Sequence, residues 1–202
     1  MLDPFYLIVD SSEWIARLLP CGVRLVQLRI KGKPDSEIRA EIVEAQALCA
    51  CEGVQLIIND YWLQAIALGC DFVHLGQGDL ATADLSAIRR AGLRVGVSTH
   101  DAKELNRALA IAPDYIALGP IYPTILKQMA FAPQGLPRIA EWKKKIGKIP
   151  LVAIGGISLE RARAVLEVGA DSAAAVTDIL LNADPERRAR DWVKATREFS
   201  PG

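Results

Sequence analysis

The sequence lacks an excess of charge of either sign, and it lacks any apolar run long enough to cross a membrane. Among its 202 residues, 24 are Lys or Arg and 24 are Asp or Glu, so the formal net charge is zero. A basic excess is typical of proteins that bind nucleic acid. A membrane helix needs roughly 20 consecutive apolar residues. We therefore expect neither a nucleic-acid partner nor a membrane partner.

The sequence also lacks a signal-peptide pattern and a metal-binding pattern of cysteines. Its first ten residues, MLDPFYLIVD, carry no basic region ahead of an apolar segment. None of the four cysteines, Cys21, Cys49, Cys51 and Cys70, has CxxC spacing, which argues against a zinc site. Reduced cysteines that fill small apolar spaces are the better interpretation. Both features predict a cytoplasmic protein.

The clearest feature present is an alternation of short apolar runs with helical segments. In the helical segments, apolar residues recur at three- and four-residue spacing. Buried strands separated by helices are typical of a parallel sheet covered by helices. Eight such units predict an α/β fold, a (β/α)8 TIM barrel that forms a single domain over residues 1–202. The strands are expected at 5–10, 23–30, 54–60, 72–76, 94–100, 115–121, 150–156 and 172–176.

An open doubly wound sheet is the alternative fold. It is disfavoured because GxGxxG is absent after the first strand, and because polar residues follow nearly all strands instead of gathering at one crevice. Among the helices, residues 36–53 have a clear helical period. A second helix is expected at 158–169, opening on a Ser158 cap and closing on Gly169.

Basic side chains follow the second predicted strand. In VQLRIKGK, Gln27, Arg29 and Lys31 alternate with Leu28 and Ile30, so the period of a strand turns the three polar side chains to one face. The carboxyl ends of barrel strands share one site. The segment therefore predicts an anion cradle at that site, and a solvated strand end is the alternative interpretation.

Two acidic residues follow neighbouring strands. Asp60 ends IIND after the third strand, and Asp79 follows HLGQ after the fourth. Close carboxylates repel each other unless a cation lies between them, and Mg²⁺ binds one or two protein carboxylates together with substrate phosphates. The pair predicts a Mg²⁺ site. Capping of the following helices is the alternative interpretation.

Further polar groups lie at other strand ends. The Gly-Gly pair of VAIGGI and the segment VTDI predict a second anion position near Gly156 and Thr177, with a tight turn as the alternative for the glycines. Ser98 has no GxSxG elbow around it, which favours a ligand contact over a nucleophile. His74 is expected to be a structural histidine at the barrel rim, and the role of His100 stays open.

The order of these motifs resembles that of the thiamine-phosphate synthase (thiamine-phosphate pyrophosphorylase) family. QLRIK is similar to the family's Gln-x-Arg-x-Lys, IIND to its Asn-Asp, and HLGQGD to its second acidic motif. GVSTH is similar to its serine motif, GPIYPTILK to its Thr-x-Thr-Lys loop, and AIGGI and AVTDI to its last two elements. The resemblance implies condensation of a hydroxymethylpyrimidine diphosphate with a thiazole phosphate, in which pyrophosphate leaves to give a stabilised carbocation.

The resemblance also implies a role for each matching position. The implied cofactor is Mg²⁺, held by Asp60 and Asp79, and the implied partners are the two small-molecule substrates, the pyrimidine diphosphate and the thiazole phosphate. Homo-oligomerisation stays open. The implied catalytic residues are Arg29, Lys31, Ser98 and Lys127. The implied substrate-binding residues are Gln27, Leu28, Arg29, Ile30, Lys31, Asn59, Ser98, Thr124, Ile125, Leu126, Lys127, Gly156, Val176 and Thr177.

Three positions depart from the family pattern. Leu126 replaces the second Thr of the loop and removes a hydroxyl that would contact phosphate, although a backbone N–H at the same place can still donate. Tyr61 follows IIND where the family often has Arg, and Thr177 replaces Ser while keeping the hydroxyl. The sequence leaves open whether Leu126 and Tyr61 weaken or change the use of substrate.

Besides a generic phosphate-binding barrel with another substrate, two other functions are compatible with the sequence. One is that of the family's sister enzyme, the thiazole tautomerase, in which His100 would transfer a proton. The retained Asn59, Asp60 and HLGQGD argue against it. The other is a noncatalytic barrel that binds thiamine intermediates, because binding and catalytic residues coincide when catalysis is mainly positioning. Mg²⁺-dependent release of pyrophosphate would distinguish an enzyme from such a barrel.

We expect Arg29→Ala and Lys127→Ala each to lower turnover by about 10²-fold or more, because each removes a group that offsets the charge developing on pyrophosphate. Steady-state rates of the purified variants check this. An unchanged rate in either variant would remove that residue from the mechanism.

Overall fold

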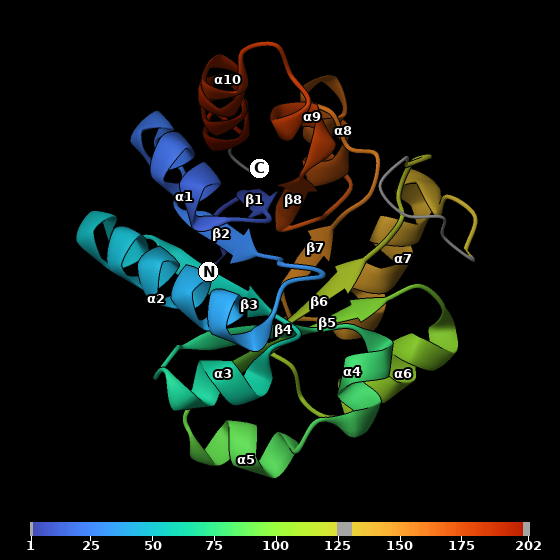
Figure 1. Ribbon diagram of the computed structural model, residues 1–202. Coiled ribbons are helices and arrows are strands. Elements are labelled where there is room, and N and C mark those ends of the chain that lie inside the picture. The colour runs from blue at the N-terminus through green and yellow to red at the C-terminus, as the bar shows by residue number, and fades with distance from the viewer. Residues whose placement is uncertain (1, 125–130, 200–202) are drawn as a thin grey trace.

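Eight parallel strands close into one barrel. The computed structural model describes residues 2–124 and 131–199. The strands pair in sequence order, and β8 returns to pair with β1, where Phe5 lies opposite Ala173. The predicted (β/α)8 barrel is therefore confirmed (Figure 1). The strands are β1 Phe5–Val9, β2 Leu25–Leu28, β3 Gln55–Asn59, β4 Phe72–Leu75, β5 Arg94–Thr99, β6 Tyr115–Leu118, β7 Leu151–Ala153 and β8 Ser172–Ala175.

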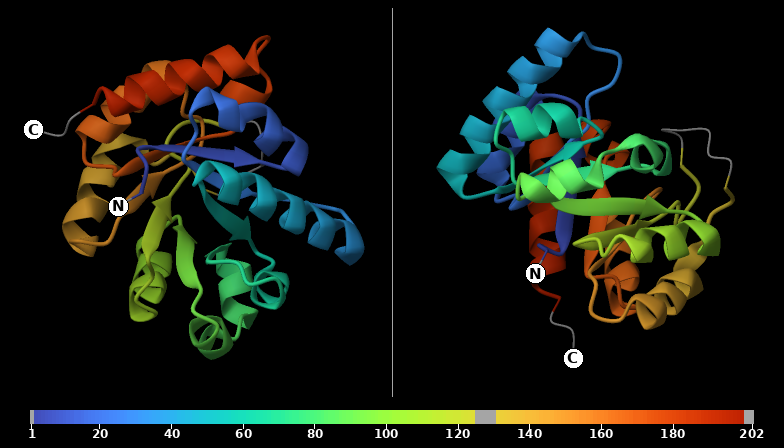
Figure 2. Two further views of the ribbon diagram at one scale, coloured as in Figure 1. Left: turned by 90° about the vertical axis from the view of Figure 1, so that its left-hand side faces the viewer. Right: turned by 90° about the horizontal axis from the view of Figure 1, so that it is seen from below.

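Helices follow the strands and enclose them, as the two further views show (Figure 2). Two helices follow β4 and two follow β8. Within the described part of the chain, no helix has the length and apolar character needed to span a bilayer. The helices are α1 Ser12–Leu18, η1 Leu19–Cys21, α2 Asp35–Glu52, α3 Trp62–Ala67, α4 Gln77–Thr82, α5 Leu85–Arg90, α6 Ala102–Ala110, α7 Gly135–Ile146, α8 Leu159–Glu167, α9 Thr177–Leu180 and α10 Pro185–Arg197.

Several strands are shorter than the sequence pattern predicts, and β2 shows why. Because β1 ends at Val9, the last bond between the two strands runs from the Arg29 N–H to the Val9 carbonyl at 2.7 Å. β2 therefore ends at Leu28. The strands β6 and β7 likewise end before their predicted limits, at Leu118 and Ala153. As a result Gln27 lies on the strand, buried, while Arg29 and Lys31 lie exposed on the loop that follows.

The two helices expected from their periodicity both form. The segment predicted at 36–53 is α2, and the one predicted at 158–169 is α8. Ser158 occupies the N-cap position of α8, but its side chain makes no capping hydrogen bond. Gly169 lies just beyond the helix end with φ +108°, a left-handed conformation that favours glycine.

The cysteines are reduced, and three of them fill apolar space as predicted. Cys21, Cys49 and Cys70 are buried, whereas Cys51 is exposed on α2. Burial raises the pKa of the Cys49 and Cys70 thiols to about 11, because a thiolate would lose its hydration there. These two side chains are therefore neutral at physiological pH and act as small core residues.

The larger part of the hydrophobic core lies between the strands and the helices. Trp142 of α7 and Trp192 of α10 are fully buried in this layer. Trp192 stacks on Phe5 of β1, with ring centroids 5.2 Å apart. Burial of one such aromatic side chain contributes about 4–6 kcal/mol of transfer free energy. This stacking helps to hold the last helix against the first strand.

The barrel interior is a second, smaller core of nine buried residues, counted among those that the structure describes, in which two tyrosines are the largest side chains together with Phe72. Tyr6 of β1 and Tyr115 of β6 are almost completely buried, and their rings meet edge to face at 6.1 Å. Gly96 of β5 lies against the Tyr115 ring, where an added Cβ atom would lie 2.2 Å from the ring carbons. The Tyr115 ring therefore occupies the space that a side chain at position 96 would need.

We expect Gly96→Ala to lower the free energy of unfolding by about 1–3 kcal/mol, because the new methyl group overpacks against Tyr115. Urea denaturation checks this. Gly78→Ala on α4 is a matched control, because nothing lies within 4 Å of its added Cβ, and it should leave the stability unchanged or raise it by up to about 1 kcal/mol. Equal unfolding midpoints for Gly96→Ala and the native chain would contradict the packing described.

Candidate active site

A polar hollow opens at the carboxyl ends of β1 and β2. Its volume is about 360 Å³, and three of the five residues that line it are cationic. A concave surface lined with cations attracts anions. The structure thus brings together Arg29 and Lys31, as the sequence predicted, and what they bind stays a prediction. The lining residues are Asp10, Ser11, Arg29, Lys31 and Lys33.

The lysines of this hollow differ in their partners. The Lys31 ammonium forms an ion pair with Asp60, at the end of the neighbouring strand. Lys33 forms an ion pair with Glu41 of α2, and Glu41 also accepts a hydrogen bond from the Ser12 N–H at 2.6 Å. Lys31 therefore links the hollow to the acidic residues, whereas Lys33 ties the loop to α1 and α2.

Asp60 and Asp79 lie together, as the sequence predicted. Asp60 directly follows β3, Asp79 lies in the first turn of α4, and their carboxylates are within hydrogen-bonding reach of each other. Neither caps a helix: the N-cap residues of α3 and α4 are Tyr61 and Gly76, and neither helix has a side-chain cap. Asp60 adopts φ +65°, a left-handed conformation that costs a residue with a Cβ about 1–3 kcal/mol.

The surroundings shift the pKa values of the two carboxyls in opposite directions. Burial alone would raise the pKa of Asp60, but the hydrogen bond and charge of Lys31 outweigh it, so the pKa is lowered. Burial and the adjacent Asp60 carboxylate raise the pKa of Asp79. The two carboxyls thus face each other, and negative charge on both is unfavourable there, a repulsion that a divalent cation between them would relieve.

Asn59, the last residue of β3, points a buried amide into the same region. The residue is 4% exposed, and its Nδ2 group has no hydrogen-bond partner among the described residues. A buried donor without a partner costs about 1–3 kcal/mol. This cost is recovered when a ligand accepts the hydrogen bond, which fits the substrate contact that the family resemblance implies for Asn59.

His74 is buried within the rim, in agreement with its expected structural role. Its Nδ1 atom is hydrogen-bonded to the Tyr115 hydroxyl at 2.6 Å, and its Nε2 atom to the Ser98 Oγ at 2.7 Å. Burial lowers the pKa of His74 to about 4, so the imidazole is neutral at pH 7. Ser98 is half-buried near the end of β5, and its carbonyl accepts a hydrogen bond from Gln77 at 2.7 Å.

Two tyrosines of this network were missed in the sequence. Tyr6 and Tyr115 lie in the apolar segments FYLIV and YIAL, which predict strands but do not indicate which hydroxyls meet inside the barrel. The Gln27 Nε2 atom donates to the Tyr6 hydroxyl at 2.8 Å, and the two tyrosine hydroxyls are 2.9 Å apart. The hydroxyl of a buried tyrosine usually has a hydrogen-bond partner. A tyrosine within an apolar strand segment is therefore the one sequence signal that a buried polar contact would form there.

The Gly-Gly pair forms a tight turn after β7. Gly155 and Gly156 have φ +95° and +65°, and added Cβ atoms would lie 2.7 Å from the Pro120 Cα and 2.3 Å from the Pro123 carbonyl oxygen. The close approach of the loop after β6 explains both glycines. The tight-turn interpretation therefore holds, and phosphate binding at Gly156 stays a prediction.

The remaining candidates for a second anion position surround this turn. The Tyr122 N–H donates to the Gly155 carbonyl at 2.9 Å, which brings the segment that carries Thr124 beside the turn. Val176 is the N-cap residue of α9, and Thr177 is its first residue. Thr124, Val176 and Thr177 are all partly exposed.

Three candidate residues of the loop after β6 cannot be placed. Ile125, Leu126 and Lys127 lie outside the described residues, so their predicted contacts stay predictions. Beyond them, the Phe131 ring stacks on His100 with centroids 4.7 Å apart, and Gln134 donates to the His100 carbonyl at 2.8 Å.

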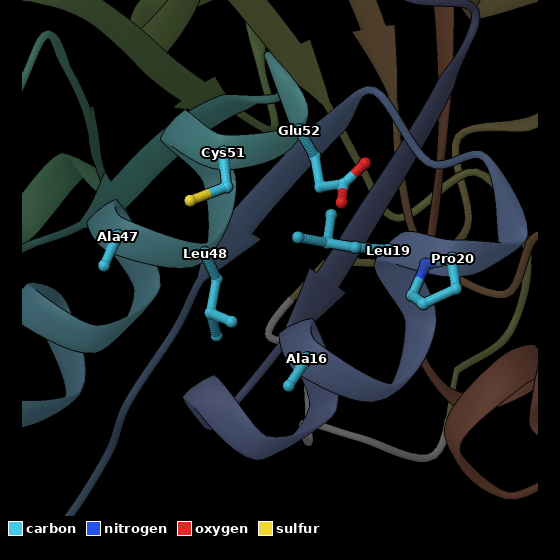
Figure 3. A pocket seen from close by; sticks show the side chains of 7 residues that line it. All are labelled: Ala16, Leu19, Pro20, Ala47, Leu48, Cys51 and Glu52. Atoms are coloured by element: carbon cyan, nitrogen blue, oxygen red, sulfur yellow. The ribbon is translucent and has the colours of Figure 1, made fainter.

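A second hollow lies outside the barrel, between α2 and the α1–η1 segment (Figure 3). Its volume is about 230 Å³, and its surface is mainly apolar. It lacks the group of cations that lines the hollow at the strand ends, so we do not assign a phosphorylated substrate to it. Its lining residues are Ala16, Leu19, Pro20, Ala47, Leu48, Cys51 and Glu52.

Comparisons with known proteins agree with the motifs. A family model described as thiamine monophosphate synthase matches residues 5–179. The thiamine-phosphate synthase of Rhizobium etli is 65% identical over 96% of both chains, and that of Cronobacter sakazakii is 55% identical over 96% of this chain and 89% of its own. The thiamine phosphate pyrophosphorylase structure from Pyrococcus furiosus has a TM-score of 0.87 and 27% identity, covering 97% of this chain and 96% of that one.

The chain belongs to the thiamine monophosphate synthase family. The family resemblance drawn from the motifs is thereby confirmed. Membership supports thiamine-phosphate synthase function, and so a transferase of thiamine biosynthesis that acts on small molecules.

Tyr61, one of the departures from the family pattern, has a structural contact in this synthase-family barrel. Its hydroxyl donates to the Ile30 carbonyl at 3.3 Å, and its ring packs against the outer core. Tyr61 thus ties the loop after β3 to the loop after β2, beside Arg29 and Lys31. Its effect on substrate use stays open.

We expect Asp79→Asn to raise the thermal midpoint of the ligand-free synthase slightly at pH 7 in chelator, corresponding to less than about 1 kcal/mol in the free energy of unfolding, because the amide removes the repulsion from Asp60. A raised folded-state pKa means that Asp79 stabilises folding most when protonated and opposes it as pH rises through that pKa. The gain should therefore disappear below about pH 3.9, the carboxyl's ordinary pKa.

Asp60→Asn is the matched control for this measurement. It removes the same repulsion but also breaks the ion pair with Lys31, so it should not raise the midpoint as Asp79→Asn does. A lower midpoint for Asp79→Asn at pH 7 would contradict the repulsion described.

Proposed function

We propose that the protein joins 4-amino-2-methyl-5-hydroxymethylpyrimidine diphosphate to 4-methyl-5-(2-phosphoethyl)thiazole, giving thiamine phosphate and pyrophosphate. The observation that carries the proposal is the Asp60–Asp79 pair, which Lys31 connects to a cationic hollow. A diphosphate suits this combination, because carboxylates bind a hard cation and basic side chains contact the phosphate oxygens.

Arg29 and Lys31 stabilise the leaving group in this proposal. As the bond between the methylene carbon and the diphosphate oxygen breaks, negative charge grows on pyrophosphate. The Arg29 guanidinium can donate two parallel hydrogen bonds to it, and the Lys31 ammonium is already held in position by Asp60. The family resemblance implies that Lys127 is a third cation beside the leaving group. Such preorganised donors each contribute about 10²–10³-fold to the rate.

The acid pair fits Mg²⁺ by the chemistry of its donors. Asp60 and Asp79 would hold the ion, and the remaining positions would be left to phosphate oxygens and water, as Mg²⁺ prefers. Bound there, Mg²⁺ supplies positive charge that polarises the phosphoryl oxygens. The lowered pKa of Asp60 keeps that ligand ionised, while the raised pKa of Asp79 makes its ionisation sensitive to the neighbouring charge.

The pyrimidine contacts orient the electron-poor carbon. When pyrophosphate leaves, this carbon becomes a carbocation stabilised by the aminopyrimidine ring, and the thiazole nitrogen attacks it. No protein nucleophile is required, so the chain's work is binding and alignment. The unpartnered Nδ2 of Asn59 donates to the pyrimidine diphosphate. Gln27 lies on the adjacent strand β2, and Ser98 lies on β5, two strands away on the other side.

The turn after β7 and the start of α9 bind the thiazole phosphate in this proposal. Backbone N–H groups near Gly156, Val176 and Thr177 and the hydroxyls of Thr124 and Thr177 would face the phosphate, as in the loops after strands seven and eight of such barrels. The loop after β6 already lies against this turn. This arrangement would place the two substrates across the same barrel mouth.

A thiazole tautomerase is the second candidate function. His100 Nδ1 is 2.7 Å from Glu104 Oε2, a histidine–carboxylate pair suited to proton transfer. That reaction has no use for the Asp60–Asp79 pair, which is why we favour the synthase. A noncatalytic barrel is the other alternative from the sequence, a cytoplasmic location stays a prediction, and homo-oligomerisation stays open.

We expect thiamine phosphate and pyrophosphate to form in equal amounts when the protein is incubated with both substrates and Mg²⁺, and excess chelator should abolish both products. Asp79→Asn should lower the rate at least about 10²-fold, while Asp191→Asn, an exposed carboxyl on α10, should match the native rate. Product formation unaffected by chelator would refute the Mg²⁺ proposal. Binding without product would favour the noncatalytic barrel, and isomerised thiazole phosphate would favour the tautomerase.

A further inference from the structure

Five polar side chains form a continuous hydrogen-bonded chain through the barrel interior. It starts at Gln27 of β2, crosses to Tyr6 at 2.8 Å and continues to Tyr115 at 2.9 Å. From Tyr115 it passes to the Nδ1 of His74 at 2.6 Å, and from Nε2 to the Ser98 Oγ at 2.7 Å. The first four members are at most 7% exposed, whereas Ser98 is partly exposed at the mouth.

Each link of this chain restricts the next one. A hydroxyl has one proton and can accept at its lone pairs, so a buried tyrosine with two partners keeps its own proton hydrogen-bonded only if it donates to one partner and accepts from the other. A neutral imidazole donates from one nitrogen and accepts at the other. A chain with every link satisfied therefore has all its protons pointing the same way, either toward Ser98 or away from it.

The Gln27 amide sets the direction. Its Nε2 atom faces Tyr6 and can only donate, so the Tyr6 hydroxyl donates to Tyr115. Tyr115 in turn donates to Nδ1 of His74, so that nitrogen accepts and carries no proton. The imidazole proton then lies on Nε2 and is donated to Ser98.

We propose that this chain fixes His74 in its Nε2–H form, so that Ser98 accepts a hydrogen bond from His74 and directs its own proton to an acceptor on the pyrimidine diphosphate. His74 and Tyr115 are positioning residues that act through Ser98. The acceptor is a phosphate oxygen or a ring nitrogen. Its identity rests on the proposed function, whereas the direction of the chain does not.

The opposite direction would have a different chemical result. If His74 carried its proton on Nδ1, Ser98 would spend its proton on Nε2 and could offer the ligand only lone pairs. Such a serine would suit a donor on the ligand, and not a phosphate oxygen. The tautomer of one buried histidine therefore determines which kind of ligand atom Ser98 recognises.

The first test is ¹⁵N NMR of the imidazoles in the ligand-free protein. The chain has two histidines, so His100→Gln assigns the signals of His74. We expect the proton of His74 on Nε2 at pH 7. A proton on Nδ1, or a mixture of both forms, would overturn the proposal. This measurement needs no activity, so it stands even if the proposed function fails.

Two tyrosine variants test the links of the chain. Tyr115→Phe removes the donor to Nδ1, so we expect His74 to become a mixture of tautomers and kcat/KM to fall about 3- to 10-fold, the range for one neutral hydrogen bond. Tyr6→Phe removes an equally buried hydroxyl but leaves Tyr115 able to donate to His74. It should keep the Nε2–H form and lower kcat/KM less than Tyr115→Phe. Equal changes in the tautomer would overturn the proposal.

A double-mutant cycle distinguishes positioning from a general loss of structure. In a Ser98→Ala background, Tyr115→Phe should cause no further fall in kcat/KM, because it acts through the missing hydroxyl. A second loss as large as in the native background would overturn the proposal.

A binding comparison identifies the acceptor, with pyrophosphate and the pyrimidine diphosphate as the two ligands. Weaker binding of both to Ser98→Ala indicates a phosphate acceptor, and weaker binding of the pyrimidine diphosphate alone indicates a ring nitrogen. Unchanged binding of both would overturn donation by Ser98.

Discussion

Closure of the barrel is the constraint on which the rest of the structure depends. The pairing of β8 with β1 turns a parallel sheet into a ring, so the carboxyl ends of all strands meet at one mouth. The ring must also be filled, and among the buried residues that fill it are Tyr6 and Tyr115, whose ring occupies the space that Gly96 leaves. The same closure that builds the core therefore brings together polar groups that are far apart in the sequence.

Several energetically unfavourable features lie together at the mouth. Asp60 has a left-handed backbone, and its carboxylate lies beside Asp79 and Lys31. Asn59 buries an amide donor without a partner among the described residues. The left-handed backbone of Asp60, the pair of acids and the unpaired amide each cost stability in the ligand-free protein. A phosphorylated ligand with a divalent cation would offset the repulsion between the acids and would accept the amide's hydrogen bond. Their convergence at one place indicates a binding site more strongly than any one of them.

Much of the fold followed from the sequence, because strand and helix periods are local patterns. The sequence predicted the eight strands, the helices α2 and α8, and the neighbouring positions of Asp60 and Asp79. The early end of β2 was not, because it depends on where β1 ends at Val9. The Tyr6–Tyr115–His74 contacts were also missed, since they join residues that are 41 and 109 positions apart. Such contacts depend on the barrel register and leave no short sequence motif.

The central claim is that the acid pair and the basic hollow together hold a metal-bound diphosphate. Calorimetric titration of pyrophosphate into the ligand-free protein, with Mg²⁺ or with chelator, tests it most directly. The account predicts binding that requires Mg²⁺, that weakens strongly in Asp60→Asn and Asp79→Asn, and that persists in Asp191→Asn. Pyrophosphate binding of equal strength with and without Mg²⁺, unaffected by loss of either acid, would contradict it.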